Sequence, residues 1–288
     1  MRKFKVIARF FIAFILAISI ISTVLLYAVS KTILSRQYVL YSLEKVDYYT
    51  KVHELVENNF EKYIQQSGLN EEVLKNLVTV EQVEEDTKKM IVSIFEGLHE
   101  KVSTNALEEK LKSNINKSIN IETLNEEQKK AIDEFVQQIC LEYKMTISNS
   151  DYEVKINSIY TKIINMISIF KTVISIIIGI SIFILILLCL RRPYKILTSI
   201  AISFMTSGLF LIIINFYINT KIKVQYISIL NDIISTVIRN IAQDVLGSIL
   251  KYGILFIITG LMLSCITNFI HKNNRYKTLM YDNTSKEK

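Results

Sequence analysis

The stretch TVISIIIGISIFILILLCL, residues 172–190, decides the fold of this 288-residue chain. It has no charged side chain, and about 20 apolar residues in a helix are enough to cross the roughly 30 Å of hydrocarbon in a bilayer. The run is too long for a single strand, and it lacks the polar stripe of an amphipathic helix on a soluble protein. We therefore interpret residues 172–190 as a transmembrane helix.

Three further uncharged runs have the same character. They are residues 10–29, 196–218 and 252–270. Half of the chain is hydrophobic, while Pro occurs once and Gly seven times, so few residues favour the turns that sheets need. The predicted fold class is all-α, with four transmembrane helices and a helical bundle between the first and the second of them.

The basic residues indicate how the four helices cross the membrane. Short segments rich in Lys and Arg stay on the cytoplasmic side. Three such clusters flank the runs at residues 1–9, 191–195 and 271–288, and we expect all three on the cytoplasmic side. The topology-determining residues are Arg2, Lys3, Lys5, Arg9, Arg191, Arg192, Lys195, Lys272, Arg275 and Lys277. Residues 30–171 and 219–251 are then outside the cytoplasm.

The N-terminal run has an alternative interpretation. A basic start, an apolar run and Ala28-Val29-Ser30 resemble a cleaved signal peptide. A run of 20 residues is longer than the usual 7 to 15, which favours an uncleaved anchor. Both alternatives leave residues 31 onward outside.

Residues 30–171 carry the spacing of several amphipathic helices. Stripes at three and four residues predict a first helix that continues from the first span and ends at Gly68, and a short second helix after Asn70. The predicted start of a long third helix is Thr79, and its buried stripe reaches Leu98 and Val102. Further helices are predicted along residues 107–119, after Asn125, and from Ser150 without interruption into the second span.

The shorter outer segment, residues 219–251, also has a helical stripe. We considered three placements: docked on the large domain, lying in the outer interface, or re-entrant as a pore element. The re-entrant alternative would bring Asp232, Arg239 and Asp244 to bilayer depth, where charges are costly.

Residues that could carry chemistry are few. His53 with Glu57, and Glu96 with His99, have helical ligand spacing, but a di-iron site needs a second Glu-x-x-His and further glutamates. Cys140 is the only cysteine expected outside, and its place on a helical stripe indicates a buried thiol. We predict no enzyme activity, no cofactor, no metal site and no catalytic residue.

Small residues in the spans indicate close helix packing instead. Ser203 with Ser207, and Gly260 with Ser264, are pairs separated by three residues that let two helix backbones approach. We name these four as helix-packing residues.

Two functions are compatible with this layout. One is a binding, scaffold or sensory subunit that meets a partner through its external helical domain. The other is a subunit of a transport complex: one span, a large external domain and three more spans is similar in layout to the ABC permeases of the lipoprotein-release and cell-division class. That resemblance implies β-structure in the external domain, whereas this domain is predicted to be helical, and it rests on no sequence motif.

The expected setting is the bacterial cytoplasmic membrane, because heavy use of Ile, Lys and Asn fits an AT-rich coding sequence. The partners expected are the lipid bilayer and another membrane or envelope protein, including a second copy of this chain. Nucleic acid is not expected, because the basic residues flank apolar runs rather than forming a folded basic face.

Overall fold

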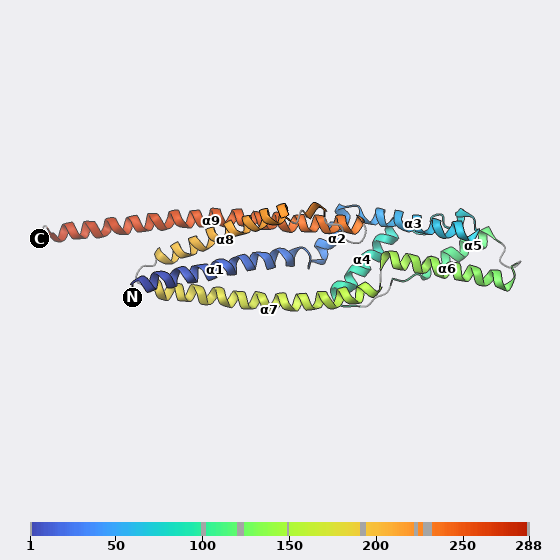
Figure 1. Cartoon of the computed structure of the whole chain (residues 1–288), viewed down its shortest axis with the longest axis horizontal. Coiled ribbons are helices and arrows are strands. Elements are labelled where there is room, and N and C mark those ends of the chain that lie inside the picture. Colours follow the sequence, from blue (N-terminus) through green and yellow to red (C-terminus); the bar gives the residue numbers. More distant parts are fainter. Residues whose placement is uncertain are drawn as a thin grey trace. The chain divides into compact units, whose positions relative to one another are not determined.

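The computed structural model describes residues 2–98, 102–119, 124–148, 150–190, 194–221, 224–226 and 232–286 (Figure 1). About 90% of the chain is helical, and the described residues include no strand. The all-α prediction is confirmed. Contacts divide the chain into two units. The span unit comprises Met1–Thr32, Asn165–Ile227 and Ile241–Lys288, and the second unit comprises Ile33–Ile164 and Ser228–Asn240.

Four helices are long and apolar enough to cross a membrane, as predicted. They are α1 (Arg2–Lys31), α7 (Ser150–Cys189), α8 (Tyr194–Lys221) and α9 (Asp232–Lys286), with candidate spans at Phe4–Lys31, Tyr160–Cys189, Tyr194–Lys221 and Asp232–Lys272. Without water, a chain in hydrocarbon must satisfy its backbone polar groups internally, and a helix does so along its whole length. The uninterrupted helix predicted from Ser150 into the second span is confirmed in α7.

Side-chain hydrogen bonds give the direction of α1 relative to α8. The Ser203 hydroxyl donates to the carbonyl oxygen of Ala13 at 2.7 Å, and the Ser207 hydroxyl donates to that of Ala17 at 3.0 Å. A step of four residues on α8 therefore matches a step of four in the same direction on α1. The two helices are parallel.

Contacts between α8 and α9 run in opposite directions. The Asn215 side chain donates to the carbonyl oxygen of Leu246 at 2.6 Å, whereas Gly208, earlier on α8, faces the later Gly253 on α9. The two helices are antiparallel. The first turn of α1, the first turn of α8 and the end of the α9 span consequently lie at one end of the span unit.

The second unit is built from shorter helices. These are α2 (Arg36–Lys45), α3 (Tyr48–Ser67), the 3-10 turn η1 (Glu71–Val73), α4 (Val80–Glu96), α5 (Asn105–Ser118) and α6 (Glu126–Ile147), with the beginning of α7 and residues 228–240. Their apolar stripes meet in one core, in which Val56, Leu111, Ile139 and Tyr143 are fully buried. The helices predicted along residues 107–119 and after Asn125 are confirmed in α5 and α6.

The helix ends follow the predicted signals. Gly68 ends α3 with φ +69°, a left-handed conformation that suits glycine. The side chains of Asn70 and Thr79 accept hydrogen bonds from the backbone N–H groups of Glu72 and Gln82. Asn125 and Gln128 form a reciprocal capping box at the start of α6. These ends were set by local sequence.

The predicted continuation of the first span into the domain is wrong. Helix α1 ends at Lys31, and a new helix begins after Ser35, whose hydroxyl accepts from the Tyr38 N–H at 3.4 Å. A second break follows at Asp47, which has φ +56°. The apolar residues keep their helical spacing on both sides of these short interruptions. The spacing alone therefore does not reveal where one helix ends and the next begins.

The predicted core position of Leu98 is also wrong. Helix α4 ends at Glu96, because Gly97 adopts φ +71° and turns the chain away. The Leu98 N–H then donates to the Ser93 carbonyl oxygen, closing the helix end, and the side chain is 45% exposed. The buried stripe of α4 consists of Val83, Thr87 and Ile91.

The outer segment 219–251 is helical at both ends. Helix α8 ends at Lys221, η3 covers Val224–Tyr226, and α9 begins at Asp232. Ile233 packs against the core of the second unit, and residues 228–240 belong to that unit. This contact favours the docked placement for the first turns of α9. Ile227 and Leu230, two members of the predicted stripe, lie outside the described residues.

Candidate functional site

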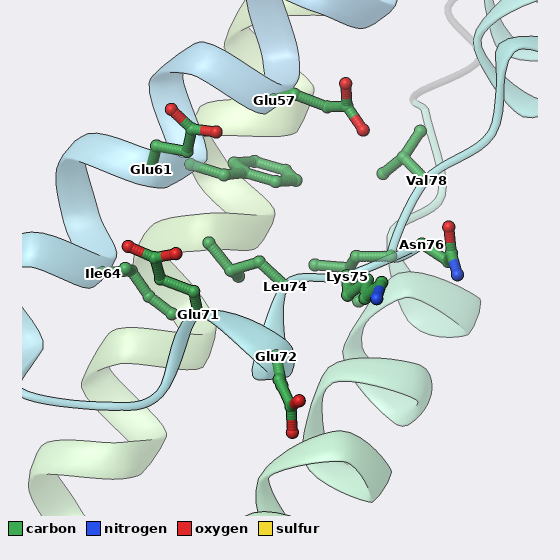
Figure 2. A pocket seen from close by; sticks show the side chains of 11 residues that line it. Glu57, Glu61, Ile64, Glu71, Glu72, Leu74, Lys75, Asn76 and Val78 are labelled. Atoms are coloured by element: carbon green, nitrogen blue, oxygen red, sulfur yellow. The ribbon is translucent and has the colours of Figure 1, made fainter.

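A pocket of about 440 Å³ lies in the second unit between α3 and the chain after it (Figure 2). Its lining residues are Glu57, Phe60, Glu61 and Ile64 from α3, and Glu71, Glu72, Leu74, Lys75, Asn76, Leu77 and Val78 from the segment that follows. The α3 residues recur at three and four positions, so one face of the helix forms one wall.

Local sequence signals shape the opposite wall. Gly68 reverses the chain after α3, and the Asn70 side chain then starts η1. The Asn114 side chain donates to the Val73 carbonyl oxygen at 3.0 Å, which fixes this segment to α5. Asn76 takes φ +55°, a conformation that Asn tolerates better than most residues. The wall is therefore held by hydrogen bonds and turn residues.

The pocket combines an apolar base with a negatively charged rim. Phe60 and Leu77 at the base are buried, whereas Glu61, Glu71 and Glu72 are exposed. Figure 2 shows the carboxylates of Glu57, Glu61 and Glu71 on the sides of the opening. Lys75 supplies the one positive charge among the lining residues. This arrangement suits a group that carries a positive charge next to an apolar portion.

His53 is joined to the same wall. Its Nδ1 lies 3.6 Å from a Glu57 carboxylate oxygen, and its Nε2 lies 3.1 Å from the Val78 carbonyl oxygen. The histidine thus links α3 to the end of the loop. The second pair with helical ligand spacing, Glu96 with His99, cannot be compared, because His99 lies outside the described residues.

The pocket residues were not predicted. Glutamates on an amphipathic helix are usually a solvated face, and nothing in the spacing of Glu71 and Glu72 assigns them to the same opening as Glu57. One local signal was present: Glu57 and Glu61 are like charges four residues apart, which is an unfavourable pair on an isolated helix.

A polar network next to this pocket ties α3 to α6. The Glu142 carboxylate accepts from the Asn59 amide at 2.8 Å and from the Tyr63 hydroxyl at 3.2 Å. The negative charge of Glu142 raises the pKa of Tyr63, which keeps that phenol protonated. In the core, the buried Tyr143 hydroxyl donates to Asp86 at 2.6 Å, and burial raises the pKa of Tyr143. The two bonds to Glu142 restrain α3, which forms one wall of the pocket, and the Tyr143–Asp86 bond joins α6 to α4.

The described residues contain no group of three His, Cys, Asp or Glu side chains that could hold a metal ion. Cys140 is buried in the core of the second unit, as predicted, and this burial raises the pKa of its thiol. A thiol that stays protonated is a poor nucleophile.

The predicted helix-packing residues lie in the span unit. Ser203 and Ser207 are buried and contact α1, as described above. A Cβ added to Gly260 would lie 2.9 Å from the Ala201 carbonyl oxygen of α8, so this glycine sits against a helix backbone. Ser264, one turn later, is half-buried.

We call the line of close contacts between α8 and α9 the seam. The sequence analysis did not predict two further residues of the seam. Gly208 and Gly253 face one another, since a Cβ on Gly208 would lie 2.5 Å from the Gly253 carbonyl oxygen. The three α8–α9 contacts pair residues 201 with 260, 208 with 253, and 215 with 246, which are steps of seven on each helix. A search for small residues at heptad spacing would have found them.

Of the topology-determining residues, the structure describes the side chains of Lys5, Arg9, Lys195 and Lys272. The structure does not describe the side chains of the other six, which are Arg2, Lys3, Arg191, Arg192, Arg275 and Lys277. The described four belong to α1, α8 and α9 at the same end of the span unit.

Comparisons with protein-family models, with curated proteins and with solved structures found no match for this chain.

Proposed function

We propose that this chain is a non-enzymatic binding subunit of the bacterial cytoplasmic membrane, anchored by four helices. The ligand or partner binds outside the cytoplasm, in the acid-rimmed pocket of the second unit. The observation that carries this proposal is the pocket itself: a 440 Å³ opening with an apolar base and four glutamates among its lining residues. Convergent polar groups over an apolar base are typical of binding sites.

The convergence of the basic residues supports the proposed orientation. Parallel α1 and α8 and antiparallel α9 put Lys5, Lys195 and Lys272 at one end of the span unit. Basic residues next to spans favour the cytoplasmic side. Both termini and the link at residues 191–195 are then cytoplasmic, and residues 30–171 form the external domain.

Cysteine labelling tests this orientation. In a variant without native cysteines, Lys110→Cys and Glu127→Cys should react with a membrane-impermeant maleimide on intact cells. Lys5→Cys and Lys272→Cys should react only after permeabilisation, because the charge clusters hold them inside. All four positions are exposed, so burial does not limit the reaction. Labelling of Lys5→Cys on intact cells would contradict the topology.

The helical character of the second unit supports binding over transport. The permeases with a similar layout carry β-structure in their external domains, whereas the described part of this unit is helical. A partner membrane or envelope protein, or a second copy of this chain, is the expected occupant of the site.

Site-specific photo-cross-linking in membranes tests the pocket. A benzophenone amino acid at Lys75, on the pocket wall, should form a discrete adduct, whereas the same group at the exposed Lys110 should not. Mass spectrometry of the adduct then identifies the occupant. The Lys75 adduct should fall at least about fivefold in a Glu61→Gln/Glu71→Gln variant, since two charge-assisted contacts are removed.

A matched charge control makes the result specific. Glu109→Gln/Glu127→Gln removes two exposed glutamates of the same unit, outside the pocket, and should leave the Lys75 adduct unchanged. Equal yields of the adduct at Lys75 and Lys110 would count against binding in the pocket. An equal fall of the Lys75 adduct in both double variants would also count against it.

A further inference from the structure

The carboxylates around the pocket of the second unit have few partners within the chain. A Glu57 carboxylate oxygen lies 3.6 Å from the Nδ1 atom of His53. The side chains of the other three lining glutamates make no hydrogen bond or ion pair in the described part of the chain; they are Glu61, Glu71 and Glu72. Lys75 also lines the pocket but makes no ion pair with them. The pocket therefore presents an excess of negative charge that the described residues do not neutralise.

The base of the pocket is apolar on both sides. Phe60 and Ile64 come from α3, and Leu77 and Val78 come from the segment that follows. The half-buried Leu74 extends this surface toward the opening. Covering apolar surface is favourable in water. An occupant that combines an apolar stem with a positive charge consequently gains contacts from the base and from the rim.

The length of the pocket suits a long side chain. The α3 wall runs from Glu57 to Ile64, which is roughly 10 Å along a helix. Figure 2 shows Glu57 on the side of Val78 and Glu71 beside Ile64, so carboxylates stand toward both ends of this wall. Lysine and arginine have aliphatic stems that pack on apolar surface and charged ends that stay among polar groups. Their three or five N–H donors can reach more than one carboxylate.

The spacing of the carboxylates favours an organic cation over a metal ion. A metal ion holds several ligands within about 2–2.6 Å of one point. The described residues contain no group of three His, Cys, Asp or Glu side chains that could hold such an ion. We propose that the pocket recognises the side chain of a lysine or arginine on the partner protein. This recognition rests on the proposed function, in which a partner protein occupies the site.

Blocked tripeptides test this recognition without the partner. N-acetyl-Ala-Lys-Ala-amide and its arginine and methionine counterparts are titrated into the full chain in a nonionic detergent, and saturation-transfer NMR measures binding above that to empty micelles. Methionine offers an unbranched stem without a charge. The lysine and arginine peptides should bind at least about tenfold more tightly than the methionine peptide, because charge-assisted hydrogen bonds are about twice as strong as neutral ones.

Two double variants locate the binding. Glu61→Gln/Glu71→Gln removes one carboxylate from each wall and should weaken binding of the lysine peptide at least about fivefold, with no change for the methionine peptide. The matched control Glu109→Gln/Glu127→Gln removes two exposed glutamates outside the pocket and should bind the lysine peptide like the wild type. All four side chains are exposed, and elution as a single species in size-exclusion chromatography checks that both variants fold.

Two results would overturn the proposal: equal affinities for the lysine and methionine peptides, or equal losses in the two double variants. Spermidine separates a protein side chain from a free polyamine, since both carry the same cationic chemistry. If spermidine bound more than about 100-fold more tightly than the lysine peptide, its two additional charges would not account for the difference. The pocket would then be a site for a small amine, and recognition of a protein side chain would be rejected.

The two proposals about this pocket fail separately, because the peptide titration needs no partner. A preference for the lysine peptide together with no Lys75 photo-adduct in membranes would reject partner occupancy and retain the chemistry of recognition. A Lys75 adduct together with no preference for the lysine peptide would retain the site and reject this chemistry.

Discussion

Gly208→Leu is expected to disrupt the span unit, with a loss of about 3 kcal/mol or more in its stability. Gly208 faces the backbone of α9: a Cβ there would lie 2.5 Å from the Gly253 carbonyl oxygen and 2.9 Å from the Ile257 backbone nitrogen. Backbone atoms cannot rotate away as a flexible side chain can. The helices must separate, and the neighbouring Asn215–Leu246 hydrogen bond is then strained or lost.

Thermal stability in detergent measures this effect. The fraction of protein that remains monodisperse in size-exclusion chromatography after heating should fall at a much lower temperature for Gly208→Leu than for the wild type. Gly247→Ala is the control, since a Cβ at this α9 position meets nothing within 4 Å. Replacing this helical glycine should leave stability equal or raise it by up to about 1 kcal/mol. Equal losses in both variants would show that the seam is not close-packed.

Leu111→Asp is expected to unfold the second unit, whereas Leu98→Asp is expected to have little effect. Leu111 on α5 is completely buried in the core, and Leu98 is 45% exposed beyond the end of α4. Truncating a buried leucine to alanine costs about 2–5 kcal/mol, and an unpaired buried carboxylate adds to this cost. A substitution at an exposed site usually changes stability by about 0.5 kcal/mol or less. The loss at Leu111 approaches the total stability of a typical domain.

The buried thiol of Cys140 can report this unfolding in the full chain. In a background with Cys189 and Cys265 replaced by Ala, a maleimide should react slowly with Cys140, which lies in the same core as Leu111. Leu111→Asp should raise the reaction rate by at least about 100-fold, corresponding to about 3 kcal/mol of lost protection. Rapid reaction in Leu98→Asp with slow reaction in Leu111→Asp would mean that the assignment of core and surface is reversed.

Much of the architecture followed from short-range patterns in the sequence. An uncharged run such as residues 172–190 has to be a helix in hydrocarbon, because no other single segment satisfies its own backbone there. Cap residues such as Asn70, Thr79 and Asn125 mark helix starts because their side chains bond to N–H groups only two or three positions away. Both signals act within one segment, so no knowledge of the rest of the chain is needed.

Two helix ends were not predicted, because the backbone conformations that cause them leave no trace in the spacing of the apolar residues. Asp47 and Gly97 adopt positive φ and divide stripes that continue on either side. Gly97 has the residue type of a helix end, but the predicted stripe ran past it to Leu98 and Val102. Val102 does pack against the core, from a position beyond the end of α4. The prediction that Val102 packs in the core was therefore right, but its assignment to the same helix as Val83 was wrong.

The sequence by itself determined the four apolar helices, the caps of the shorter helices and the segregation of the basic residues, because each depends on neighbours within a few turns. Only the tertiary structure decided that Gly208 meets Gly253, that Lys5 and Lys195 lie at the same end of the span unit, and that Glu57 shares an opening with Glu71. Each of these pairs joins different elements, and its geometry depends on the register between helices or on the path of a turn. The physical reason is that close packing between elements fixes register by the fit of surfaces, which no periodicity within one helix contains.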